Sequence, residues 1–160
     1  MQFRRVAGIP AARRPGSIES SVYLLDTNVI SELRRARPHS GVLAWLRSVD
    51  HRLLRLSVVS LGEIQAGIEL TRDQDPGRAA EIERWADEVA RAYEVLSMDP
   101  MVYRTWAKLM HRKSDTLADD ARIAATAIVH GLVVVTRNVR DFQSFAVPTL
   151  NPFQTALNER

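Results

Sequence analysis

VYLLDTNVISELRR, residues 22–35, joins a short apolar run to a helical pattern through the tripeptide Asp-Thr-Asn. The apolar residues up to Leu25 predict a buried strand, and SELRRA, from Ser31 onward, predicts a helix. Asp26 stands at the junction between the two. Two interpretations are open: Asp26 caps the following helix or forms an Asx turn, or its carboxylate holds a metal ion. The choice depends on where the other acidic residues fall.

The alternation of strand-like and helix-like patterns continues along the chain. Residues 53–59 (LLRLSVV) predict a second strand, and residues 60–70 predict a helix with Ser60 as its N-cap. Residues 132–136 (LVVVT) form the continuous apolar run typical of a strand buried on both faces. The other expected elements are helices at 39–49, 78–94, 100–113 and 121–130, a turn-rich break at 71–77, a loop and short helix at 137–145, and short strands at 95–98 and 147–150. Strands separated by helices predict an α/β fold with a mainly parallel sheet.

Length and composition indicate an ordinary globular protein. The chain of 160 residues suits one domain, which we place at residues 21–152. Residues 1–20 hold four arginines and one acid, so we expect a basic, disordered extension there, and residues 153–160 form a C-terminal tail. The rest of the chain has equal numbers of basic and acidic side chains, which gives no sign of a DNA-binding face. Cysteine is absent, which excludes disulfides and fits a cytoplasmic location. No apolar run approaches the roughly 20 residues that cross a membrane.

Four acidic residues fall where the predicted strands end. Asp26 follows the first strand, and Asp141 follows the last long one. Glu63 lies in the helix after the second strand, and Asp120 opens the alanine-rich helix. Functional groups of an open parallel sheet gather beyond the carboxyl ends of its strands, so we expect these acids to converge. Converging carboxylates repel unless a cation neutralises them, and their oxygens suit Mg²⁺ or Mn²⁺.

A structural interpretation of each acid also stands. Taken one at a time, each is more easily explained as a helix cap or a solvated side chain than as a catalytic residue. The small and apolar neighbours of Glu63 and Asp120 favour an interior cleft instead. Glycine-rich phosphate loops, zinc-ligand spacings and Gly-x-Ser-x-Gly elbows are absent. A phosphatase of the haloacid-dehalogenase type would need a second acid two residues after Asp26, where this chain has Asn28.

Four segments around these acids resemble the successive signature blocks of the PIN domain. The closest likeness is to the VapC/FitB-type toxins of bacterial type II toxin–antitoxin systems. The segments are LLDTNVISEL (24–33), SVVSLGEIQAGIE (57–69), DDARIAATAIVHGL (119–132) and VVTRNVRDF (134–142). The resemblance covers about residues 22–152 and implies a three-layer α/β/α fold with a central, mainly parallel sheet. It also implies a Mg²⁺-dependent ribonuclease, with Mn²⁺ as the alternative ion, that cleaves RNA phosphodiesters by activated water.

The resemblance assigns roles to individual residues. Asp26, Glu63 and Asp120 match the three catalytic acids, with Asp26 and Asp120 as the principal metal ligands and Glu63 assisting them. Asn138 and Asp141 compete for a fourth position, because the family has either Asp or Asn after the last long strand.

Three further residues and several partners follow from the same likeness. Thr27 and Asn28 match residues that orient Asp26, and Arg137 either contacts an RNA phosphate or is a solvated surface arginine. The family implies a homodimer and a VapB-like antitoxin that lies across the active site, with operator DNA bound only through that antitoxin. A catalytically inactive PIN-like module that acts through protein partners is the alternative. Retention of all three acids argues against it.

Overall fold

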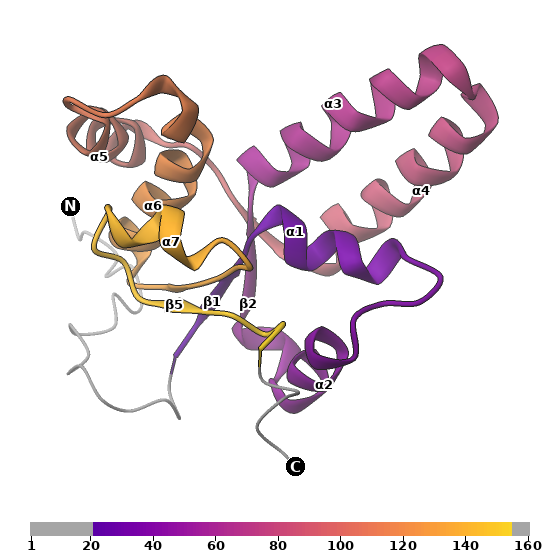
Figure 1. The fold of residues 1–160 in the computed structure, drawn as a ribbon, viewed down its shortest axis with the longest axis horizontal. Coiled ribbons are helices and arrows are strands. Elements are labelled where there is room, and N and C mark those ends of the chain that lie inside the picture. The colour runs from indigo at the N-terminus through magenta and orange to yellow at the C-terminus, as the bar shows by residue number, and fades with distance from the viewer. Residues whose placement is uncertain (1–20, 155–160) are drawn as a thin grey trace, which may run out of the picture.

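The computed structural model describes residues 21–154, and strands alternate with helices throughout that range (Figure 1). The strands are β1 (Tyr23–Leu25), β2 (Leu54–Ser57), β3 (Glu94–Leu96), β4 (Val133–Val135) and β5 (Thr149–Leu150). The helices are α1 (Thr27–Ile30), α2 (Ser40–Ser48), α3 (Val58–Gln74), α4 (Pro76–Ala92), α5 (Pro100–Met110), α6 (Ala118–His130) and α7 (Val139–Gln143). Short 3₁₀ turns fill Ser31–Arg34, His51–Leu53 and Asp115–Leu117. The predicted extension at 1–20 and the end of the predicted tail, 155–160, lie outside the described residues.

The five strands form one sheet in the order β3-β2-β1-β4-β5, and every described pair of neighbours is parallel. The central strand β1 pairs through Tyr23 with Leu54 of β2 on one side and with Val133 of β4 on the other. Strands β2 and β3 lie on one side of β1, and strands β4 and β5, which come later in the chain, lie on its other side. The predicted α/β class is confirmed, and the sheet is parallel across all its described pairs.

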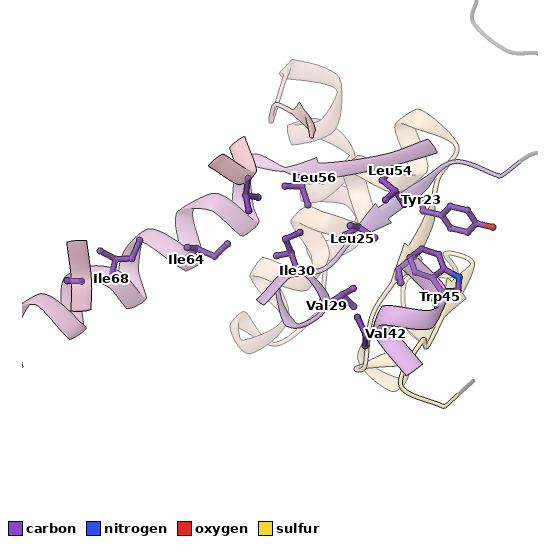
Figure 2. Packing of buried hydrophobic residues seen from close by; sticks show 13 residues of the cluster. Tyr23, Leu25, Val29, Ile30, Val42, Trp45, Leu54, Leu56, Ile64 and Ile68 are labelled. Atoms are coloured by element: carbon purple, nitrogen blue, oxygen red, sulfur yellow. The ribbon is translucent and has the colours of Figure 1, made fainter. Parts of the chain in front are cut away.

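Two hydrophobic clusters cover the two faces of the sheet. The side chains of β1 alternate between them, since Tyr23 and Leu25 belong to one cluster and Leu24 to the other. The first cluster reaches α1, α2, α3 and α4, and Figure 2 shows its side chains, with the Tyr23 and Trp45 rings 5.1 Å apart edge to face. The second cluster reaches α5, α6 and α7, which lie on the opposite side of the strands in Figure 1. This is the three-layer α/β/α arrangement that the resemblance implies.

The predicted boundary between the second strand and its helix is wrong by two residues at the strand end and by three at the N-cap. The strand ends at Ser57 rather than at residue 59, and the N-cap of α3 is Ser57 rather than Ser60. The Ser57 hydroxyl accepts the backbone N–H of Val59 at 3.1 Å, which begins the helix early. Two β-branched valines therefore belong to a helix because a capping hydroxyl outweighs their preference for strands.

The break predicted at 71–77 is also too long. Helix α3 continues to Gln74, and α4 begins at Pro76, so Asp75 alone separates the two helices. The Asp75 carboxylate accepts the Arg78 N–H at 3.1 Å, and Pro76 occupies the first turn, where its missing N–H costs nothing. Gly131 caps the C-terminus of α6 in the left-handed conformation, with φ of 66°. No helix in residues 21–154 combines the length and apolarity that a membrane crossing needs.

Candidate active site

The sheet order places a crevice beside the carboxyl end of β1. Strand order reverses between β1 and β4, and the connections after these strands leave in opposite directions. Asp26 follows β1 directly, and Thr136 follows β4 directly. Asp120 lies in the first turn of α6, and Glu63 lies in the second turn of α3. Four segments that are far apart in the sequence therefore meet at one edge of the sheet.

Asp26 is buried, with 4% of its surface exposed, and three donors fix its carboxylate. One oxygen, Oδ1, accepts the Thr27 N–H at 2.8 Å. The other, Oδ2, accepts the Thr136 hydroxyl at 2.8 Å and the Asn28 side-chain amide at 3.3 Å. Burial raises the pKa of Asp26 above its usual value, and the hydrogen bonds from Thr136 and Thr27 oppose that rise. Asp26 is the N-cap of α1, which confirms the first interpretation of the tripeptide, and its carboxylate also lines a cleft, where metal binding stays a prediction.

The sequence did not identify Thr136 as a site residue. Its hydroxyl accepts the Asn138 N–H at 3.0 Å and donates to Asp26. Asn28 makes a second link between the segment after β1 and the segment after β4, because its side-chain oxygen accepts the Arg137 N–H at 3.1 Å. The predicted orienting role of Asn28 thus has a geometric basis. A hydroxyl residue at the end of an apolar run was the only signal in the sequence for Thr136, and many strand ends share it.

A cleft of about 290 Å³ brings the three predicted acids together. The residues that line it are Asp26, Thr27, Asn28, Ser31, Glu63, Asp120 and Asn138. Burial raises the pKa of Asp120 to about 6, and the charges of Asp26, Asp141, Glu63 and Asp119 add to the rise. Burial also raises the pKa of Glu63, with the charges of Asp26 and Asp119 adding and the Thr27 hydroxyl opposing. The acids of the cleft therefore hold protons more readily than isolated carboxyls do, and at Glu63 and Asp120 the charges of neighbouring acids contribute to this.

The donor set of this cleft fits a hard divalent cation. Carboxylate, amide and hydroxyl oxygens surround it, and the described part of the chain offers no sulfur ligand there. The Thr27 hydroxyl is buried and makes no regular hydrogen bond with the described residues, although it lies close enough to Glu63 to lower the pKa of that carboxyl. No three Asp, Glu or His side chains within residues 21–154 are grouped tightly enough to hold an ion as they stand. Coordination by all three acids would therefore require their side chains to draw closer.

The two candidates for the fourth position differ in their surroundings. Asn138 lines the cleft, whereas Asp141 is exposed and does not line it. Asp141 is still close enough for its charge to raise the pKa of Asp120. Asn138 is thus part of the cleft wall, whereas Asp141 affects the cleft through its negative charge.

Arg137 is held by protein contacts on the outside of the site. Its guanidinium lies 3.7 Å from a Glu32 carboxylate oxygen and 3.9 Å above the centroid of the Phe153 ring. Glu32 is only 3% exposed and also accepts the His39 N–H at 2.9 Å. Nothing in the sequence distinguished Glu32 from the exposed acids of other helices. About half of the Arg137 side chain is exposed, so it is neither fully solvated nor enclosed.

A family model for the PIN domain matches residues 23–148. The chain belongs to the PIN-domain family. It is 35% identical over 141 residues to the VapC ribonuclease Y4jK of Sinorhizobium fredii, across 83% of this chain and 99% of that protein. It is 33% identical over 139 residues to the toxin FitB of Neisseria gonorrhoeae, across 81% of this chain and 97% of that protein. Each of these alignments covers nearly the whole length of the relative.

A solved structure agrees with the sequence comparisons. FitAB bound to a DNA fragment is similar with a TM-score of 0.72 and 30% identity, over 82% of this chain and 96% of that one. The predicted resemblance to VapC/FitB-type PIN domains is therefore confirmed at the level of the family and the fold.

Proposed function

We propose that this PIN domain is the toxin of a toxin–antitoxin pair and acts as a metal-dependent ribonuclease. The convergence of Asp26, Glu63 and Asp120 on one cleft is the observation that carries the proposal. The names of the relatives, a VapC ribonuclease and the toxin FitB, support the same activity. We also propose that the protein acts in the cytoplasm, where its RNA substrate lies.

In the proposed mechanism, Asp26 and Asp120 would hold Mg²⁺, or Mn²⁺ as the alternative, with Glu63 as a third carboxylate. A divalent ion bound there would activate a water and neutralise charge on the phosphate. The chain's own contribution is orientation, because Thr136 and Thr27 fix both oxygens of Asp26 before any ligand binds. Asn138 supplies an uncharged oxygen at the same edge, which adds no further repulsion against a phosphate.

Metal-dependent cleavage of RNA is the direct test. We expect purified protein to cut RNA in Mg²⁺, to stop in EDTA, and to recover when Mg²⁺ or Mn²⁺ is restored. Asp26→Ala should remove cleavage, whereas the exposed helix acid Asp87 can be changed to Asn without loss. Intact RNA under all conditions, with normal binding to a protein partner, would instead support the inactive binding module.

We propose an antitoxin as the partner, because FitAB, a relative at 30% identity, was solved as a complex on DNA. The partner would be VapB-like, would lie across the cleft, and would contribute all of the operator binding. We also propose a homodimer. Co-expression with a candidate VapB-like antitoxin, followed by affinity capture and light scattering, tests both statements. We expect the complex to bind operator DNA and the isolated toxin not to bind it.

A further inference from the structure

A second cleft adjoins the acidic one and shares a wall with it. It has a volume of about 440 Å³ and lies between the first turns of α3 and the helices α5 and α6. Glu63 lines both clefts, so whatever occupies the second cleft is next to the acids. Its size is within the range of about 300–1,000 Å³ that small-molecule sites occupy. The remaining residues that matter here are Val58, Ala66, Met98, Tyr103, Asp119 and Arg122.

The walls of this cleft present flat and apolar groups to solvent. Tyr103 of α5 is 48% exposed and Val58 of α3 is 36% exposed, so a ring and an aliphatic side chain from two helices are accessible at the cleft. Arg122 is held in place, because its guanidinium carbon lies 4.9 Å from the centroid of the Trp106 ring and its Nη1 lies 2.5 Å from Asp119. The Tyr103 ring meets Trp106 edge to face, with centroids 5.9 Å apart. An aromatic side chain and a guanidinium are thus already positioned at the cleft before any ligand binds.

The charges of the cleft disfavour a phosphate as its occupant. Glu63 and Asp119 are two acids against the single base Arg122, which is already paired with Asp119. An anion would meet net negative charge, whereas an uncharged planar group would find apolar walls and polar atoms at the rim. Unpaired RNA bases are such groups, and proteins recognise them by stacking on aromatic rings and arginine planes.

We propose that this cleft, formed by α3, α5 and α6, binds one unpaired base of the RNA beside the phosphate that is cut. The inference rests on the proposed ribonuclease function and adds a subsite that selects single-stranded RNA. Tyr103 supplies the stacking surface, and the free edge of the Arg122 guanidinium donates to a base oxygen. The backbone phosphate of the same nucleotide lies outside this cleft, on the side of the acids.

Binding of short RNAs with single missing bases tests the proposal. The probes are a fluorescein-labelled single-stranded RNA octamer without self-complementarity (GAAACUAA) and the same octamer with an abasic ribose at each position in turn. Fluorescence anisotropy with the full-length protein in EDTA measures affinity without cleavage. We expect one abasic position to weaken binding to the wild type by about 5- to 100-fold, the usual range for a base–aromatic stack. Tyr103→Ala should weaken binding of the intact octamer by the same factor. For this variant, an abasic ribose at the sensitive position should weaken binding no further.

Two variants control for fold and surface. Tyr103→Phe keeps the stacking ring and should bind as the wild type does. Met101→Ala removes an exposed side chain from the same helix, outside the cleft, and should also leave binding unchanged. Thermal unfolding of each variant shows that the fold is intact.

The outcomes separate this proposal from the ribonuclease proposal. If the wild type cuts RNA in Mg²⁺ while Tyr103→Ala binds every octamer as tightly as the wild type, the subsite is wrong and the ribonuclease stands. If the base-dependent loss occurs without any cleavage, the subsite stands and the ribonuclease is wrong. If Tyr103→Ala leaves RNA binding intact but releases the co-expressed antitoxin, the cleft is a peptide-docking surface and the proposal is overturned.

Discussion

At the scale of the residue, the candidate site depends on donors that hold Asp26. The two oxygens of this buried carboxylate are satisfied from its own loop and from Thr136, 110 residues away in the sequence. Asp26, Glu63 and Asp120 could be predicted from the sequence because acids after parallel strands converge at one edge. Thr136 could not, because no local pattern states which side chain a distant hydroxyl will face. Glu32 was missed for the same reason, since its burial depends on partners outside its own turn.

Thr136→Val tests this support directly. The substitution keeps the shape of the side chain but removes the hydroxyl that donates to Asp26 at 2.8 Å. A buried acceptor without its donor costs about 1–3 kcal/mol, so we expect that loss in the free energy of unfolding by urea, with slower RNA cleavage. Thr136→Ser should restore both. Thr126→Val is the matched control, because Thr126 is also buried but donates to a carbonyl of its own helix at 2.9 Å. Equal effects of the two valine variants on cleavage would contradict the assigned role.

Asp120→Asn should separate stability from function. Burial and neighbouring acids raise the pKa of Asp120 from 3.8 to about 6, so the folded protein retains a proton that the unfolded chain releases. In EDTA, the free energy of unfolding should therefore fall as the pH rises from about 4 to about 6. Asp120→Asn removes this loss. We expect the variant to be more stable than the wild type by about 1–2 kcal/mol at pH 7.5, after allowance for partial exposure.

The same variant should show only a small part of this advantage near pH 4, where Asp120 is protonated in the folded wild type and partly protonated in the unfolded chain. Urea unfolding at the two pH values makes the comparison. The variant should also lose RNA cleavage in Mg²⁺. A variant that is no more stable at pH 7.5 than at pH 4, relative to the wild type, would show that the acids do not strain one another.

At the scale of the element, the order of helices and strands was predictable, but their ends were not. Alternating apolar runs and helical patterns identified the five strands and the longer helices in order, but the helix predicted from Ser31 onward is a 3₁₀ turn that follows the short helix α1. The start of α3 was missed because Val58 and Val59 continue an apolar run, while the hydroxyl of Ser57 turns the chain into a helix. Likewise, the polar residues at 71–77 suggested a loop, although Asp75 and Pro76 allow two helices to meet almost directly. Single capping contacts decide such boundaries, and composition does not reveal them.

Arg137 illustrates a loop anchored to other elements. It pairs with Glu32 at 3.7 Å and stacks on Phe153 at 3.9 Å, and its backbone holds Asn28. We expect Arg137→Gln to lower the free energy of unfolding by about 0.5–1.5 kcal/mol through the lost stack and ion pair. Phe153→Leu should reproduce part of that loss. If Arg137 instead contacts an RNA phosphate, Arg137→Gln should leave the stability unchanged. The slope of the logarithm of the RNA-binding constant against the logarithm of the salt concentration should then be shallower by about one. Urea unfolding and salt titrations of RNA binding distinguish the two.

At the scale of the whole molecule, the sheet order is what creates the site. Strands of two to four residues carry too little pattern to reveal their neighbours, so the order β3-β2-β1-β4-β5 could not be derived from residue patterns alone. Parallel pairing of β1 with both β2 and β4 puts α3 and α6 on opposite faces, and each helix brings one acid to the edge where Asp26 lies. The resemblance to the PIN domain, which rests on four segments that occur together and in order, implied the three-layer class and the parallel sheet in advance, but it gave no strand order.

A cation that binds the cleft must stabilise the whole fold, and this follows without any measurement of catalysis. The metal-free protein gathers acids whose raised pKa values reflect burial and, at Glu63 and Asp120, repulsion by neighbouring acids, and a bound divalent ion removes that repulsion only in the folded state. Mg²⁺ at about a hundred times its dissociation constant should add about 2.7 kcal/mol to the free energy of unfolding. Urea unfolding of the wild type in EDTA and in Mg²⁺ measures the gain. Asp26→Asn should lose it, whereas Asp87→Asn, which changes an exposed acid of α4, should keep it in full. An equal gain in both variants would place the ion elsewhere on the protein and remove the basis for a metal-dependent nuclease at this cleft.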